Sequence, residues 1–562
     1  MSRLSTLMLL SALALQASAI EGVQLHGSIQ SDILFPDGKI NNNGTEIDDK
    51  VLTNTYADLG LTSRYVDAGL RFEYLQHPLP IFVEPDFKGW GVPYFYVKGK
   101  YKGLELTAGD VYEQFGSGLI LRTYEDRAVG IDNAIRGGRL KVNCLDGLRF
   151  TVLGGLQRRY FDWPDRSVLG GADLEFDINS YSSALRDRNI TWTIGGSYVI
   201  KHEKDEDILV PGSNYRLNLP LNVNAFDVRT QFYRNSFNLL GEFAWKNNDP
   251  SVKNHYIYKT GTAYLLSASY SRSGWSAFVQ AKRSENMSFR SQRAENGMAS
   301  FVNYMPPFAY QHTYTLASMY PYATQYETGE WAFQAAGVYT FKRHTPLGGK
   351  YGTKLRLNVS YIRSLKEKDG GKAADATLKV PNTTYGTDGP KTEFFGMGAL
   401  NYADINLQME KRIVRDFNLN LMYMYQKYNN AVLSTEESEE HEDPIGMINS
   451  HIFVAEGKWK INKRNTLRAE AQYLTTRQAK KDWVFGLLEY SLAPYLMFSV
   501  SDQWNCGKTK EHYYMFNVTG NYKNNRLMLG YGRTREGFNC SGGVCRFVPE
   551  SKGFQISYNY NF

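Results

Sequence analysis

The sequence lacks any run of 18 consecutive apolar residues, although 42% of its residues are hydrophobic. A helix needs about 20 such residues to cross a bilayer, so helical membrane spans are excluded. Proline is scarce, with 18 residues in 562, and no stretch rich in proline or serine marks a linker between domains. The net charge of +7 is small and is spread along the chain. Such a distribution argues against a nucleic-acid-binding tail, so we expect no nucleic-acid partner.

Cysteine is also scarce, with four residues in the whole chain. Cys540 and Cys545 enclose the stretch SGGV, Cys506 lies in the previous long loop, and Cys144 stands alone. An exported protein can form disulfides, so we expect a Cys540–Cys545 bridge or a bridge from either residue to Cys506. A zinc site would need closer pairs and histidine partners, which are missing. We therefore expect no metal and no cofactor.

Recognisable catalytic motifs are missing too. The sequence contains neither H-E-x-x-H nor G-x-S-x-G. Its nine histidines are scattered, without a serine or acidic partner at a recognisable spacing. The acidic run from Ser434 to Asp443 lacks the glycine and the alternating spacing of a calcium loop, so we interpret it as a solvated loop tip. These observations predict that the protein is not an enzyme.

The first residues are typical of an export signal. Arg3 supplies a positive charge, the apolar stretch LMLLSALALQ follows, and Ala17 to Ala19 fits a small-residue cleavage site. We expect residues 1–19 to be removed as a signal peptide. The remaining residues 20–562 are expected to form a single domain.

Apolar–polar alternation is abundant, together with 40 Tyr and 30 Phe residues. The last ten residues, GFQISYNYNF, place Phe554, Ile556, Tyr558, Tyr560 and Phe562 at alternate positions. LRLNVSY, FNLNLMYMY and TLRAEAQY alternate in the same way. Successive side chains of a strand point to opposite faces, so each run predicts a strand with one apolar and one polar face.

The joins between these runs alternate between short and long. Residues 521–525, 492–494, 461–465 and 412–416 form short joins, and longer joins lie between them. Outer-membrane barrels have short periplasmic turns and long extracellular loops, and only helices and closed barrels satisfy every backbone group in lipid. A soluble sandwich or β-helix is disfavoured because the rhythm is sustained without a fixed repeat. We expect an all-β, closed antiparallel transmembrane β-barrel of about 24 strands (22–26) in the bacterial outer membrane.

A barrel of this width needs something to fill it, because barrels of about 16–18 strands already leave an aqueous channel. The first expected strand begins beside the cleavage site, with no plug domain before it. We expect the bore to be closed by the chain's own loops or by a lumen-plugging or surface partner protein. Two candidate lumen or lid segments are residues 112–136 and residues 285–327.

The first candidate segment is rich in charge and in glycine, which permits tight bends. An inward-folded hairpin whose charges pair in the lumen would explain this composition. An ordinary pair of strands with external charges is the alternative. The residues that we expect at a lumen constriction are Arg122, Arg127, Arg136, Arg139, Glu113, Glu125 and Asp126.

The second candidate segment concentrates aromatic rings with methionine and proline. A merely solvated loop has no need of so many rings. We expect them to pack as a lid in the barrel mouth, to dock on a partner or to stack on a ligand such as a sugar. The aromatic residues concerned are Tyr304, Phe308, Tyr310, Tyr314, Tyr320 and Tyr322.

Two long motifs carry a resemblance to a known family. GDVYEQFGSGLILRTYEDRAVGIDNAIRG and QHTYTLASMYPYATQ resemble a domain-of-unknown-function family of outer-membrane β-barrel proteins from Bacteroidota. The last strand also resembles the C-terminal aromatic signature by which outer-membrane proteins are recognised for insertion. These resemblances imply contact with outer-membrane lipid and with the barrel-assembly machinery, and they imply no activity.

The strand faces expected to line the bore carry more cations than carboxylates. The cations are Arg71, Arg139, Lys141, Arg149, Arg229, Lys354, Arg356, Arg468 and Arg526, and the carboxylates are Glu73, Asp227 and Glu470. Rings of Arg and Lys favour anions in pores. We expect a porin-like channel for small or anionic solutes, gated by its own loops. Alternatively, these charges pair to hold inner loops, and the barrel is a non-conducting subunit that scaffolds an outer-membrane complex and is sealed by a partner.

Overall fold

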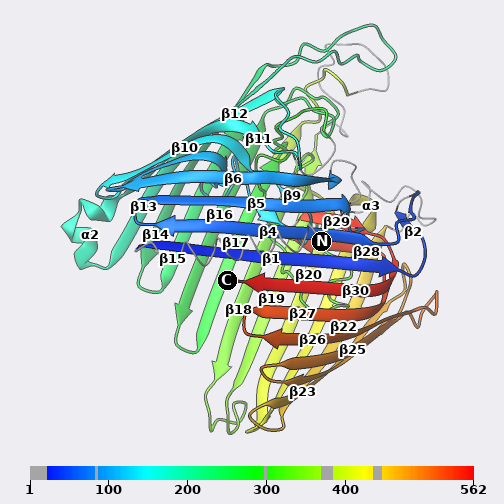
Figure 1. Ribbon diagram of the computed structural model, residues 1–562. Helices are drawn as coiled ribbons and strands as arrows, with labels where there is room; N and C mark the ends of the chain where they lie inside the picture. Colours follow the sequence, from blue (N-terminus) through cyan, green and yellow to red (C-terminus); the bar gives the residue numbers. More distant parts are fainter. Residues whose placement is uncertain are drawn as a thin grey trace.

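A closed antiparallel barrel makes up almost the whole structure (Figure 1). The structure is a computed structural model that describes residues 22–562, except residues 43, 81, 83–86, 296–299, 369–383, 434–445 and 543. The expected signal segment and the acidic run lie outside the described residues. Twenty-four strands form one sheet whose first and last strands pair, which confirms the fold expected from the sequence.

The wall of the barrel contains the long strands. In chain order these are β1 (Val23–Pro36), β4 (Leu52–Ser63), β5 (Val66–His77), β6 (Gly89–Tyr101), β7 (Leu104–Val111), β10 (Ile135–Leu145), β11 (Leu148–Gln157), β12 (Ser167–Asp177), β13 (Ile190–Glu203), β14 (Asn222–Arg234), β15 (Phe237–Lys246), β16 (Gly261–Arg272), β17 (Trp275–Glu285), β18 (Glu330–Phe341), β19 (Thr353–Glu367), β20 (Thr392–Val414), β21 (Phe417–Asn429), β22 (Met447–Lys460), β23 (Asn465–Thr476), β24 (Trp483–Leu492), β25 (Leu496–Trp504), β26 (His512–Tyr522), β27 (Asn525–Thr534) and β30 (Ser551–Asn561).

Three short hairpins and three short helical pieces lie outside the wall. They are β2 (Ile40–Asn42) with β3 (Thr45–Ile47), β8 (Glu125–Asp126) with β9 (Ile131–Asp132), β28 (Gly537–Ser541) with β29 (Val544–Val548), η2 (Ile178–Ser180), α2 (Ser183–Asp187) and α3 (Asn430–Leu433). None of the described helices is long and apolar enough to cross a bilayer.

The first and last strands close the ring. β1 and β30 pair in antiparallel register, with Ser28 opposite Asn561 and Pro36 opposite Gly553. The backbone groups of Gly27 and Phe562 bond reciprocally, each at 3.0 Å. The closed ring leaves no row of unpaired backbone groups, which is the condition for a sheet in lipid.

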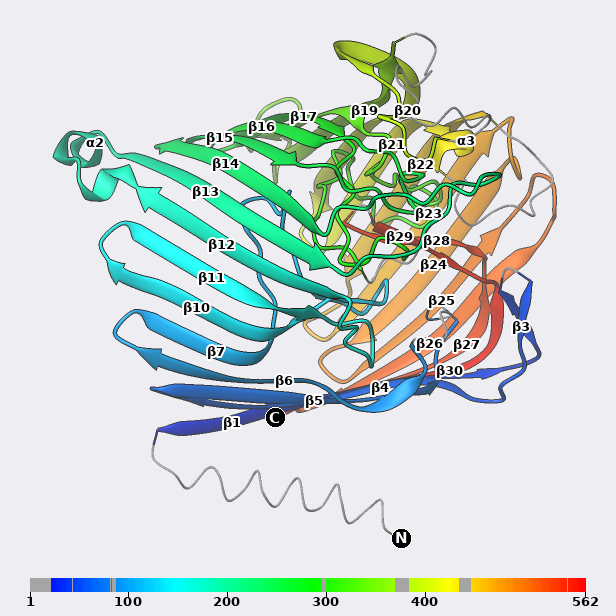
Figure 2. The same cartoon turned by 90° about the horizontal axis from the view of Figure 1, so that it is seen from above.

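Short turns and long loops lie at opposite ends of the barrel, because neighbouring strands are antiparallel. β4 and β5 are joined by two residues, whereas β17 and β18 are joined by residues 286–329. Figure 2 shows α2 at one end of the barrel and the long loops gathered inside the ring toward the other end. This arrangement matches the rhythm of short and long joins in the sequence.

The outer face of the wall is apolar. Val97, Leu106 and Val228 expose 54%, 61% and 58% of their surface, although each lies on a regular strand. A band of outward apolar side chains on a closed barrel is suited to contact with lipid tails. The protein is an outer-membrane β-barrel that crosses the membrane many times.

The main hydrophobic core lies inside the bore rather than between two sheets. Met422, Met424, Ile452 and Leu474 are on the inner faces of β21, β22 and β23, and they are at most 5% exposed. Leu316, from the loop after β17, covers them. The expectation of a polar lumen face is therefore wrong along these strands, because chain packed inside the barrel replaces the water.

Candidate functional site

Residues 112–134, which we call the inner segment, cross the bore. They connect two neighbouring strands, β7 and β10, yet contact strands several places away on both sides of this pair. The Ser117 N–H donates to Glu242 of β15 at 3.1 Å, while Arg127 donates to Gln30 of β1 at 3.0 Å. β1 and β15 lie nearly opposite each other in the ring of 24 strands. A single segment can reach both only through the interior.

Residues 286–329, which we call the long loop, fold onto the inner segment. The Arg122 N–H donates to the Val302 carbonyl at 2.8 Å, and the Tyr304 N–H donates to the Gly118 carbonyl at 2.9 Å. The Asn303 side-chain amide donates to the Leu119 carbonyl at 3.0 Å. Backbone pairing of this kind joins the two segments into one body that occupies the lumen.

Apolar side chains anchor this body. Phe115, Leu119, Ile120 and Leu121 of the inner segment are at most 1% exposed. They share one hydrophobic cluster with side chains of the long loop and of the wall from β11 to β21. Their stretch of sequence alternates poorly, because both of its faces are covered.

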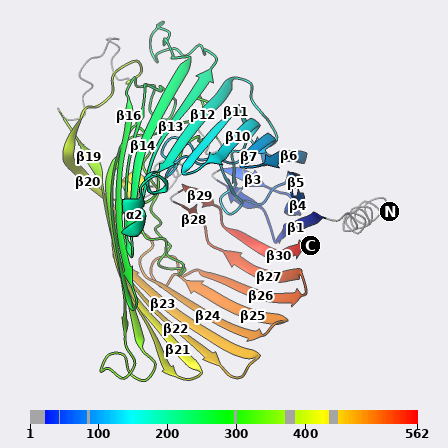
Figure 3. The ribbon, with the colours of Figure 1, turned by 90° about the vertical axis from the view of Figure 1, so that its left-hand side faces the viewer.

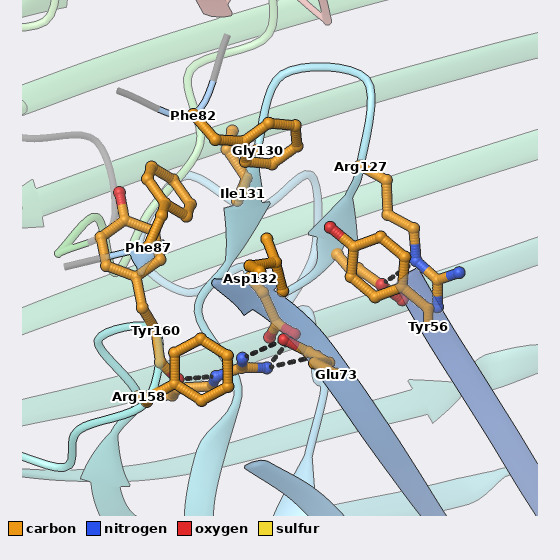
Figure 4. Close-up of a pocket in the computed structure, with 13 residues that line it drawn as sticks. Tyr56, Glu73, Phe82, Phe87, Arg127, Gly130, Ile131, Asp132, Arg158 and Tyr160 are labelled. Carbon is orange, nitrogen blue, oxygen red and sulfur yellow. Dashed lines mark hydrogen bonds and ion pairs between the residues drawn. The ribbon is translucent and has the colours of Figure 1, made fainter. Parts of the chain in front are cut away.

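A group of paired charges holds the inner segment to the wall near β4 and β5. We call it the charge cluster, and it consists of Asp58, Arg71, Glu73, Glu125, Arg127, Asp132 and Arg158. Arg71 donates to Asp58 at 2.7 Å and to Glu125 at 2.8 Å. Arg158 bridges Asp132 and Glu73 (Figure 4). Removing one partner of such a buried pair typically costs about 3–5 kcal/mol, because the remaining charge stays buried.

Aromatic rings surround the charge cluster. Phe82, Phe87 and Tyr160 line a small cavity of about 30 Å³, together with Arg127 and Asp132 (Figure 4). The Arg127 guanidinium lies 4.2 Å from the centre of the Tyr56 ring. Burial lowers the pKa of Arg127, but Glu125 and Asp58 outweigh burial and raise the pKa above its usual value. Arg127 therefore stays charged while it is enclosed.

A larger cavity adjoins this one. The seam cavity has a volume of about 380 Å³ and lies against β1, β4, β27 and β30. Its lining includes the polar side chains of Gln30, Asn54, Thr534 and Gln555. Tyr56, Phe82 and Arg127 border both cavities, so these three side chains lie between them. The bore is therefore filled unevenly, with space left beside the strands that close the ring.

Most of the remaining residues expected at a constriction are drawn together in the lumen. Glu113 accepts from Arg139 at 3.0 Å and lies 2.7 Å from the Lys141 ammonium. The Arg122 guanidinium lies 4.5 Å from the Tyr124 ring and 3.9 Å from the Tyr304 ring. Asp126 has a local role, since it accepts the backbone N–H of Ala128 at 2.9 Å.

The structure corrects the expectation for Arg136. Arg136 lies opposite Asp110 of β7. Gly138 and Leu140 follow at every second position of β10, so they are on the same face of the strand as Arg136. Leu140 is 38% exposed on the outer surface. Arg136 pairs with Asp110 at 2.8 Å and lies 3.5 Å from the Trp163 ring. Arg136 is on the outer face because it is an odd number of positions away from Arg139, which faces inward. The Trp163 ring covers Arg136 there.

The aromatic residues of the long loop mostly pack on the inner wall. Phe308 and Tyr322 are 1% and 5% exposed. The Tyr314 hydroxyl donates to Glu456 of β22 at 2.8 Å. Burial raises the pKa of Tyr320 to about 12. Tyr310 is only half-buried and borders a further cavity, which is considered below.

The hairpin of β28 and β29 lies inside the ring (Figure 3). Cys540 and Cys545 form a disulfide across it, and Cys506 is a free thiol. The Asn539 side chain donates to the Ala128 carbonyl at 2.8 Å, and Gln311 donates to the Cys540 carbonyl at 3.2 Å. The hairpin thus touches both the inner segment and the long loop.

Sequence reasoning missed a second set of buried charges. Lys201 lies 2.8 Å from Asp249 and 3.0 Å from Glu203, and Arg293 of the long loop lies 3.0 Å from Glu203. The available signal for this set was a lysine near the end of a strand, next to a long loop. Within the described part of the chain, no group of three or more His, Cys, Asp or Glu is arranged to hold a metal ion.

Several solved membrane proteins are similar in overall shape. The P pilus usher (PapC) translocation pore has 10% identity and a TM-score of 0.41, over 96% of this chain and 99% of that chain. The siderophore receptor PirA from Pseudomonas aeruginosa has 9% identity and a TM-score of 0.40, over 96% and 80%. Pseudomonas aeruginosa OprD has 9% identity and a TM-score of 0.31, over 97% of each chain. Similarity at this level carries nothing about function.

Comparison of sequences gives a family and no closer relative. No curated protein matches the chain. The model of a family of unknown function (DUF6029) matches residues 1–562, in agreement with the resemblance carried by the two long motifs. The chain belongs to this family of unknown function.

Proposed function

We propose that the protein is a porin-like channel for small solutes, gated by its own inner segment. The observation that carries this proposal is the seam cavity, a space lined by both polar and apolar side chains beside a bore that is otherwise largely filled. A solute path along β1 and β30 would need only a local movement of residues near Arg127. We also propose that the protein comes from a bacterium of the Bacteroidota, as the two motifs suggest.

Arg127 is the side chain best placed to act as the gate. It donates to Glu125 at 2.5 Å, to Asp58 at 3.1 Å and to Gln30 at 3.0 Å. Only the Glu125 bond is within the inner segment, so the other two tie the segment to the wall. A rotation of this side chain would widen the connection between the two cavities, which Tyr56 and Phe82 also border.

The charges on the bore argue against a strong preference for anions. Seven of the nine cations expected on the lumen face form ion pairs with carboxylates, namely Arg71, Arg139, Lys141, Arg149, Arg229, Arg356 and Arg468. Paired charges contribute little net potential to a pore. The proposal is therefore a channel for small solutes of either charge, with anions not strongly favoured.

Swelling of proteoliposomes in arabinose, chloride and gluconate tests this function. The wild type should admit arabinose slowly, and Arg127→Ala should admit it about threefold faster because the side chain that narrows the path is removed. Arg526→Ala is the matched control, since Arg526 has no ion pair among the described residues, and it should leave swelling unchanged. A folded Arg127→Ala barrel that admits no solute would contradict the channel.

A non-conducting scaffold is the second candidate, and the apolar anchor favours it. Phe115 and Leu119 are buried as deeply as a protein core, and an element anchored in this way opens rarely. Purification in mild detergent distinguishes the two functions. A stoichiometric partner that co-purifies with a barrel lacking conductance supports the scaffold.

A further inference from the structure

A third cavity lies between the long loop, β20 and the hairpin of β28 and β29. We call it the tyrosine cavity. It has a volume of about 200 Å³ and is lined by Tyr310, Tyr320, Tyr322 and Tyr402, among others. Pockets that enclose drug-sized ligands have volumes of about 300–1,000 Å³. The tyrosine cavity is smaller than these, and its size suits a ligand of one sugar ring.

The lining of the tyrosine cavity carries no Asp, Glu, Lys or Arg among the described residues. The cavity around the charge cluster, by contrast, has five such residues, Glu73, Glu125, Arg127, Asp132 and Arg158. A charged ligand in the tyrosine cavity would lose its hydration without gaining a counter-charge. The ligand that fits this lining is therefore uncharged.

Two rings of the lining are only partly buried and have edge-on neighbours. They are Tyr310 and Phe538. Tyr310 meets His312 edge-on, with the ring centres 4.9 Å apart, and Phe538 meets Phe547 edge-on at 5.9 Å. An edge-on neighbour holds a ring in place and leaves a flat face for a ligand. The C–H groups on one side of a pyranose form an apolar face that suits such a surface.

Two amide side chains complement the rings. Gln311 and Asn539 are exposed and line the cavity. Each uses its NH₂ group in a bond to the protein, Gln311 with the Cys540 carbonyl and Asn539 with the Ala128 carbonyl. Their side-chain oxygens have no partner within the described residues. Those oxygens can accept hydrogen bonds from ligand hydroxyls, which gives a site its specificity.

The cavity is held open by contacts behind its lining. His312 is 2.8 Å from Asp404, and the Tyr322 hydroxyl donates to Glu330. The Cys540–Cys545 disulfide fixes the hairpin that carries Phe538 and Asn539. A preformed site loses little conformational entropy when a ligand binds.

We propose that the tyrosine cavity binds one pyranose unit of an uncharged oligosaccharide. Tyr310 and Phe538 stack on the apolar face of this sugar, and the side-chain oxygens of Gln311 and Asn539 accept hydrogen bonds from its hydroxyls. The site does not depend on conduction through the bore. Asn539 also lines the seam cavity, so a bound glycan would lie next to the space proposed for solutes.

Binding can be measured on the full-length protein in lauryldimethylamine oxide, a detergent without a sugar headgroup. The probes are maltohexaose, cellohexaose, xylohexaose and mannohexaose, followed by saturation-transfer-difference NMR and calorimetry. At least one should bind with a Kd of about 1 mM or tighter. Hexagalacturonate, which carries carboxylates, should bind at least about tenfold more weakly than that best neutral sugar.

Substitutions separate this site from surface adsorption. Tyr310→Ala and the double variant Gln311→Ala/Asn539→Ala should each weaken binding about tenfold, and both change side chains that are exposed or half-buried. Tyr181→Ala is the matched control, because Tyr181 is 65% exposed near the turn end, and its binding should equal that of the wild type. Failure of all four neutral sugars to bind, or binding unchanged in both variants, would overturn the proposal.

Discussion

At the scale of single residues, arginine decides how the bore is filled. Arg71 contacts Asp58 and Glu125, which lie on the wall and on the inner segment respectively. A guanidinium can serve several carboxylates at once because it has five donors in a fixed plane. The same side chain therefore completes the wall and attaches the inner segment.

Arg71→Ala is expected to loosen the inner segment without opening the wall. Asp58 and Glu125 would each keep only Arg127 of their two guanidinium partners, so the inner segment would be held less firmly to the wall. Hydrogen exchange should become faster in residues 124–133 and stay slow in β4 and β5. Arg526→Ala, the control, should leave both rates as they are, and unchanged exchange in Arg71→Ala would contradict the role of the charge cluster.

Residue roles could be predicted from the sequence only in part. The inward position of Arg139 follows from strand alternation, because Leu140 beside it must face lipid. Arg136 was assigned to the wrong face of the strand. It lies close to the boundary between loop and strand, where the alternation does not determine which way a side chain points. Arg158 was missed entirely, because it lies just beyond β11 in a join, where alternation gives no information.

At the scale of elements, the disulfide hairpin contacts both the inner segment and the long loop, which fill the bore. The Asn539 side chain donates a hydrogen bond to the inner segment, and the Cys540 carbonyl accepts one from Gln311 of the long loop. A crosslink that spans so few residues constrains mainly its own hairpin. Its loss should therefore affect the loop locally and leave the wall intact.

The double variant Cys540→Ser/Cys545→Ser tests this local role. Limited proteolysis should cut residues 535–550 several times faster than in the wild type, because the free hairpin opens more often. The heat-induced electrophoretic shift of the barrel should occur at the same temperature in both proteins. Cys506→Ser is the control, and a wall that melts earlier in the double variant alone would contradict the local role.

Elements of the wall were predictable, whereas their inner packing was not. FNLNLMYMY alternates as a strand, and β21 contains it in full. Met422 and Met424 of this run face inward and are buried beneath the long loop. Period-two patterning states which residues share a face, but it does not state whether water or protein covers that face. The two methionines were the available signal that protein, rather than water, covers the inner face of this strand.

At the scale of the whole molecule, two requirements act against each other. A ring of 24 strands must close to satisfy its backbone in lipid, and closing it creates a bore far wider than the side chains can fill. The chain fills that bore with the inner segment, the long loop and the hairpin, joined by backbone pairing and buried ion pairs. The seam cavity is the space left over.

The filled bore predicts a response to removal of the inner segment. Replacing residues 113–133 by a short Gly–Ser linker removes the anchor and three of the seven residues of the charge cluster, so the long loop loses its support. Single-channel conductance in planar bilayers, compared with that of the wild type, measures the result. The account predicts a rise of at least about fivefold in a barrel that still shows the heat-induced electrophoretic shift. A folded variant that conducts no more than the wild type would contradict it.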